Sequence, residues 1–179
     1  VNAKAKTCRW LREFNAPVVL DGQKRGPWDF YPSFIDANPD LLDREKWYKT
    51  PVMKSGNVIS EYRKVTKEFD KVLKANGYER KGTIYKAVEP NTKTLVFFCH
   101  FGVECVLVSH LINTSPVCLW QGMCAAPTSV TTLISEEREQ GKAFFRCSSF
   151  GDISHLYAAN EEPAFAARFC ETYDNKEQR

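Results

Sequence analysis

The sequence predicts an α/β fold: a mainly parallel sheet with helices on both faces and an antiparallel edge. Residues 95–99 are an uncharged apolar and aromatic run, which is typical of a strand buried on both faces. Directly after Gly102 the apolar positions of residues 103–111 take helical spacing, so a strand, a tight turn and a helix follow one another. Such units build open parallel sheets. Residues 129–135 and 143–147, on either side of a polar stretch, predict the antiparallel edge.

A long helix is predicted between Ser60, a favourable N-cap residue, and Gly77, a favourable residue just beyond a helix. Apolar side chains recur between them at helical spacing. The other predicted elements are, in chain order, a short strand at 8–14, a packed aromatic-rich loop at 21–40, a short helix at 40–49 stopped by Pro51, a hairpin at 78–88 and a terminal helix at 162–172. Together they predict one domain over residues 1–172, with the hairpin as an insertion and a polar tail at 173–179.

Composition excludes several classes of function. The hydrophobic content of 43% is ordinary for a globular core, and 25 basic against 22 acidic residues leave a net charge of +3, too weak to predict a nucleic-acid partner. No apolar run approaches the roughly 18 residues of a membrane-spanning helix, and the N-terminus lacks the apolar middle of a signal peptide. The seven cysteines contain no Cys-x-x-Cys pair, so we expect reduced thiols, no metal site and a cytoplasmic location. The first residue is Val rather than Met, as expected of a truncated or processed chain.

His100 lies at the carboxyl end of the predicted 95–99 strand, where open α/β sheets bind their ligands. The following helix begins near Gly102 and Val103, whose backbone N–H groups and positive dipole end suit an anion. A histidine at that junction adds a proton or a positive charge for the same anion. A packed, structural histidine explains the pattern equally well, so the residues alone leave both interpretations open.

Four segments resemble motifs of the histidine phosphatase (phosphoglycerate mutase-like) superfamily, in that family's order. W-L-R-E-F with G-P-W resembles the segment that carries its catalytic acid, and F-C-H-F-G resembles its second-histidine motif. The segments lie at 10–14 with 26–28, at 98–102, at 126–133 (A-P-T-S-V-T-T-L) and at 151–156 (G-D-I-S-H-L). The resemblance covers residues 10–156, with an insertion in the middle.

The resemblance implies a phosphoglycerate mutase-like fold and phosphoryl transfer or hydrolysis on a phosphorylated small metabolite, with no metal and no organic cofactor. It makes His100 and Glu13 the catalytic residues. Glu13 would protonate the leaving oxygen, and His100 would stabilise the charge on the transferring group. The residues alone also allow a surface Glu13 paired with a neighbouring arginine.

Four further residues are predicted to bind the substrate: Gly102, Val103, Arg12 and His155. The first two would offer backbone N–H groups, and Arg12 would clamp a phosphate. His155 stands where relatives also carry histidine. The residue types fix neither the substrate nor the choice between mutase and phosphatase.

The family's nucleophilic histidine is missing from this sequence. Its three histidines are His100, His110 and His155, and none stands in the family's Arg-His-Gly motif. Two hypotheses follow: the chain is the C-terminal part of a phosphatase or mutase-like enzyme and is inactive alone, or it is a non-catalytic phosphate- or anion-binding regulatory module. Without the family's first strand the 95–99 strand would keep a bare edge, so the isolated chain is expected to form a homodimer, capture its own N-terminal segment or aggregate.

Overall fold

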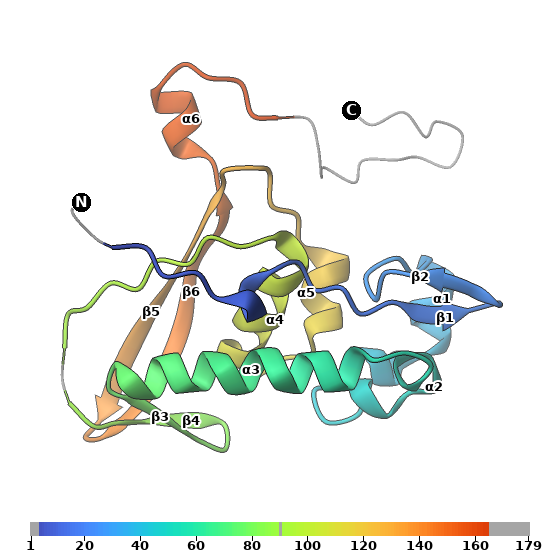
Figure 1. Cartoon of the computed structure of the whole chain (residues 1–179), viewed down its shortest axis with the longest axis horizontal. Coiled ribbons are helices and arrows are strands. Elements are labelled where there is room, and N and C mark those ends of the chain that lie inside the picture. The colour runs from blue at the N-terminus through green and yellow to red at the C-terminus, as the bar shows by residue number, and fades with distance from the viewer. Residues whose placement is uncertain (1–3, 90, 165–179) are drawn as a thin grey trace.

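Strands pair in antiparallel fashion throughout residues 4–89 and 91–164, the part of the chain that the structure describes. This computed structural model contains a four-stranded sheet and a two-stranded sheet (Figure 1). The first has the order β3 (Tyr78–Lys81), β4 (Ile84–Ala87), β6 (Lys142–Asp152), β5 (Val130–Glu139), and the second joins β1 (Val18–Leu20) to β2 (Gln23–Arg25). The α/β class is confirmed, but the predicted mainly parallel sheet is wrong. A parallel sheet needs several buried strands side by side, and the one candidate strand at 95–99 pairs with none of the described strands.

The segment 95–99 runs as an extended trace outside both sheets (Figure 1). Phe98 exposes 90% of its surface, so the predicted burial on both faces is wrong. Phe97 alone is directed into the protein, where its ring lies 6.5 Å from Trp10 and 5.5 Å from Phe69 between centroids. An apolar run becomes a central strand only where other strands flank it, and hydrophobicity cannot show whether they do.

Both antiparallel predictions are confirmed. β3 and β4 form the 78–88 hairpin, and Gly82 in its turn has a φ of +65°. β5 and β6 form a second hairpin whose strands are longer than the predicted 129–135 and 143–147 segments. β4 pairs with β6, so the inserted hairpin continues the sheet.

The long predicted helix is present as α3 (Val58–Ala75), but it begins earlier than predicted. Asn57 is its N-cap residue, whereas Ser60 lies in the first turn and its hydroxyl donates to the Asn57 carbonyl over 2.9 Å. Gly77 follows the helix with a φ of +97°, a left-handed conformation that favours glycine.

The N-terminal segment differs from the prediction. A single 3₁₀ turn, η1 (Arg9–Leu11), replaces the predicted strand at 8–14. Trp10 is buried in this turn, so the apolar character of the segment reflects core packing rather than a sheet. The predicted 21–40 loop contains β2 and a short helix, α1 (Pro32–Ala37).

The helix predicted at 40–49 is also wrong. Two 3₁₀ turns, η2 (Pro39–Leu41) and η3 (Trp47–Lys49), occupy this stretch. Pro51 was expected to stop a helix, but it begins one instead, α2 (Pro51–Lys54). Backbone N–H groups in the first turn of a helix have no partner within the helix. Proline has no N–H, so it suits a helix start.

Two short helices were not predicted, α5 (Pro116–Gly122) and α6 (Ser154–Ala158). The predicted terminal helix at 162–172 lies outside the described residues except for 162–164, which have no regular structure. Among the described residues, no helix combines the length and the apolar character needed to cross a membrane.

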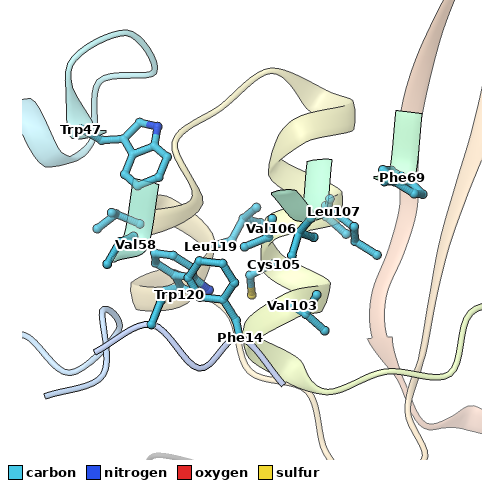
Figure 2. Packing of buried hydrophobic residues seen from close by; sticks show 14 of the residues in the cluster. Phe14, Trp47, Val58, Phe69, Val103, Cys105, Val106, Leu107, Leu119 and Trp120 are labelled. Carbon is cyan, nitrogen blue, oxygen red and sulfur yellow. The ribbon is translucent and has the colours of Figure 1, made fainter. Parts of the chain in front are cut away.

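The core gathers around α4 (Phe101–Ile112), which confirms the predicted helix and begins slightly earlier. Val103, Val106 and Leu107 of α4 are buried, and α3 and α5 pack against this helix. Figure 2 shows Phe14 and Trp120 beside the N-terminal turns of α4. The start of α4 is therefore surrounded by the aromatic core, which fixes the position of every group around it.

Candidate anion site at the N-terminus of α4

His100 immediately precedes α4, with an extended backbone at φ −102° and ψ 162°. Its carbonyl accepts a hydrogen bond from the Glu104 N–H over 2.9 Å. Its imidazole is exposed and has no hydrogen-bond partner within residues 4–89 and 91–164. The N–H groups of Gly102 and Val103 in the first turn also lack a partner in those ranges. This helix end therefore offers a ligand two backbone donors and a titratable ring.

Glu13 brings a carboxylate against the first turn of α4. A Cβ built on Gly102 would lie 2.6 Å from Glu13 Oε1 and 2.9 Å from Trp28 Cζ3. Glu13 is half-buried, and its Oε1 accepts a hydrogen bond from the Phe14 N–H over 2.6 Å. This close approach leaves no room for a larger residue at 102. It also places Glu13 at the same helix end as His100.

Aromatic packing from α5 holds this arrangement. Phe14 is buried and its ring lies 5.4 Å from that of Trp120 between centroids (Figure 2). Trp120 Nε1 donates to the Gly102 carbonyl over 3.0 Å, and Gln121 Nε2 donates to the Trp28 carbonyl over 2.7 Å. One short helix therefore fixes the Glu13 segment, the Trp28 segment and the first turn of α4 relative to one another.

A second carboxyl, that of Glu104, lies in the same turn. Burial raises its pKa above the ordinary carboxyl value, and a hydrogen bond from Thr131 on β5 partly opposes the shift. The Thr131 hydroxyl oxygen in turn accepts from the Gly151 N–H over 3.0 Å. The sequence analysis did not select Glu104 as a site residue. The signal that could have found it is its place between the apolar Val103 and Cys105.

Two thiols border this helix end. Burial, assisted by the charges of Glu104 and Glu13, raises the pKa of Cys99 to about 12, although the residue as a whole keeps part of its surface exposed. Cys105 is buried, and the same causes raise the pKa of its thiol. Both side chains are therefore protonated at neutral pH and supply no nucleophile. All six cysteines in the described ranges are free, and Cys170 lies outside them.

Two of the predicted substrate-binding residues lie apart from the others. Arg12 is exposed, and its Nη2 is directed to Glu61 Oε1 of α3 at 3.9 Å. His155 is an exposed residue of α6, which Figure 1 shows standing away from α4 beyond the end of β6. The structure thus brings together His100, Glu13 and the Gly102–Val103 backbone, but not Arg12 or His155.

The opposite end of α4 carries a polar cluster around a cavity of about 230 Å³. His110 Nε2 lies 2.9 Å from Asp70 Oδ1 of α3. Arg80 of β3 donates to the Tyr85 hydroxyl, the His110 carbonyl and Asn113 Oδ1 over 2.6, 2.9 and 2.8 Å. These groups satisfy one another and tie the end of α4 to α3 and the hairpin, so their role is structural.

No protein-family model, curated protein or solved structure matches this chain. Within the described residues, no cluster of three or more His, Cys, Asp or Glu side chains could hold a metal ion.

Proposed function

We propose that the N-terminus of α4 binds the phosphoryl group of a phosphorylated small metabolite, in a site of histidine phosphatase type. The observation that carries the proposal is the contact between Glu13 and Gly102, two residues after His100. The segments that resemble the family's acid motif and second-histidine motif are distant in the sequence and adjacent in the molecule. Their meeting at one helix end supports a common role.

Each group at this helix end has a distinct task in such a reaction. The imidazole of His100 and the N–H groups of Gly102 and Val103 donate hydrogen bonds to the oxygens of the bound phosphoryl group. Glu13 gives a proton to the leaving oxygen from a half-buried position. Burial raises the pKa of Glu104, which favours its protonated form and so lessens its repulsion of the anion. These steps need neither a metal nor an organic cofactor.

Turnover also requires a nucleophile, and neither His110 nor His155 lies at the site. His110 is hydrogen-bonded to Asp70 at the other end of α4, and His155 lies on α6. The thiols of Cys99 and Cys105 are protonated. We therefore propose that a nucleophilic histidine comes from residues outside this chain, and that the isolated chain binds phosphate without hydrolysing phosphomonoesters.

The same lack of a nucleophile favours a second candidate, a non-catalytic phosphate- or anion-binding module. Such a module would keep His100 and the helix N-terminus as its binding groups. It would have no use for a proton donor, so Glu13 would serve only to pack against Gly102.

One experiment tests the binding site and separates the two candidates. The product of the complete open reading frame is assayed for hydrolysis of p-nitrophenyl phosphate and, by calorimetry, for binding of inorganic phosphate. Hydrolysis that falls in both Glu13→Gln and His100→Ala supports the enzyme. Phosphate binding that depends on His100 but not on Glu13, without hydrolysis, supports the module. Neither candidate survives if phosphate does not bind.

A further inference from the structure

Residues 94–99 form an extended segment outside both sheets. No backbone hydrogen bond is made by these residues to any part of the chain that the structure describes. The segment T-L-V-F-F-C contains no charge, no proline and no glycine, and it is rich in β-branched and aromatic residues. These properties are typical of segments that pair with another strand wherever their edge is bare.

The side chain of Phe97 anchors this segment to the core. Phe97 packs between Trp10 of η1 and Phe69 of α3. Its neighbours Val96 and Phe98 point the other way and expose 68% and 90% of their surface. With Phe97 packed inward, the segment presents an apolar outward face.

We propose that this segment pairs with the same segment of a second copy of the chain, as two antiparallel strands related by a two-fold axis at Phe97. In this register Val96 of each copy lies opposite Phe98 of the other, and Leu95 lies opposite Cys99. An aromatic and a β-branched side chain on the same face of neighbouring strands form a favourable cross-strand pair. Pairing about a two-fold axis uses the same edge of both copies. It therefore forms a dimer and cannot extend to further copies.

Charge decides the direction of pairing and favours a second copy as the occupant. An antiparallel pairing centred on Phe97 keeps the two Lys93 side chains at opposite ends of the paired segment, so no like charges meet. A parallel register would place Lys93 opposite Lys93, which is unfavourable. The core of the segment carries no charge that a charged partner could complement, and its own sequence supplies the matching apolar side chains. The inference does not depend on the proposed phosphoryl site.

Sedimentation equilibrium of the full 179-residue chain over a wide range of concentrations tests the pairing. We expect a reversible dimer with twice the chain mass of 20.5 kDa. Phe98→Lys should weaken dimerisation about tenfold or more, because it places a charge against the partner's apolar side chains. Val96→Lys should do the same, and it replaces Phe98→Lys if that variant does not fold. Tyr157→Lys removes a similarly exposed aromatic side chain from α6 and should leave the dimer unchanged.

Hydrogen exchange locates the contact. Amides of residues 95–99 should become protected as the concentration rises through the dimer range, and Phe98→Lys should abolish this protection. A chain that stays monomeric at all concentrations would overturn the proposal, as would a dimer unaffected by both lysine variants. A continuous series of higher oligomers would overturn the closed two-fold pairing.

Discussion

The carboxylate of Glu13 lies against the α-carbon of Gly102, close enough that a Cβ at residue 102 would be 2.6 Å from Glu13 Oε1. This contact joins an N-terminal segment to the start of a central helix. It also explains why glycine stands at 102, where the helical backbone itself does not require it. The proposed proton donation by Glu13 depends on this approach.

Gly102→Ala should therefore be strongly unfavourable. The added methyl group would collide with Glu13 and with Trp28 Cζ3, 2.9 Å away, and the ring is held among packed aromatic side chains. Overpacking of this kind typically lowers the free energy of unfolding by about 1–3 kcal/mol. Urea denaturation measures the change. Gly122→Ala is the matched control, because a Cβ at the end of α5 meets nothing within 4 Å. Equal loss in both variants would contradict the close approach.

Glu104 should make stability depend on pH. Burial raises its folded-state pKa, so between its ordinary pKa and the raised value the folded protein keeps a proton that the unfolded chain has released. The free energy of unfolding then falls as pH rises through this window. Glu104→Gln removes that loss, so the variant should gain stability relative to wild type as pH rises through this window. Glu161→Gln, an exposed site, is the control. Parallel curves for wild type and Glu104→Gln would refute the shift.

The cysteines should differ in reactivity with iodoacetamide. All seven should be alkylated in the denatured, unreduced protein. In the native protein Cys105 should be protected by burial. Cys99 should react about tenfold or more slowly than free cysteine at pH 8, because its pKa is raised to about 12 and little thiolate is present. Peptide mapping by mass spectrometry reports each site. Rapid labelling of native Cys99 would show that its thiol is not perturbed.

Arg80 should contribute to stability through its three hydrogen bonds. Arg80→Ala would leave the Tyr85 hydroxyl, the His110 carbonyl and Asn113 Oδ1 without their donor. The expected loss is about 2–3 kcal/mol in the free energy of unfolding. Thermal and urea unfolding measure it, with the exposed Arg63→Ala as control. A loss no larger than that of the control would contradict a stabilising role of these three hydrogen bonds.

Local signals were enough to predict the elements that carry their own pattern. The apolar spacing of residues 103–111 predicted α4, and the turn around Gly82 predicted the β3–β4 hairpin. The arrangement of the sheet could not be predicted in this way. Whether the 95–99 run is flanked by other strands depends on the rest of the fold, and its side chains look the same in either case.

The candidate site was predictable only in part. Glu13, His100 and Gly102 were selected from motifs, and the structure brings these three together. Glu104 was not selected, because its burial and its hydrogen bond from Thr131 of β5, which is distant in the sequence, depend on the folded structure. Arg12 was selected by its proximity in sequence to Glu13, yet its side chain reaches α3 instead. Proximity along the chain says little about side-chain direction where the backbone turns, as it does in η1.

Binding of inorganic phosphate to the 179-residue chain, measured by calorimetry, tests the central claim most directly. We expect binding in the wild type and a loss of about tenfold or more in affinity in His100→Ala, because a hydrogen bond to a charged group is worth about 1.5–3 kcal/mol. Lys54→Ala, which removes an exposed charge at the end of α2, should bind as the wild type does. Equal affinities in wild type and His100→Ala, or no phosphate binding at all, would contradict an anion site at the start of α4.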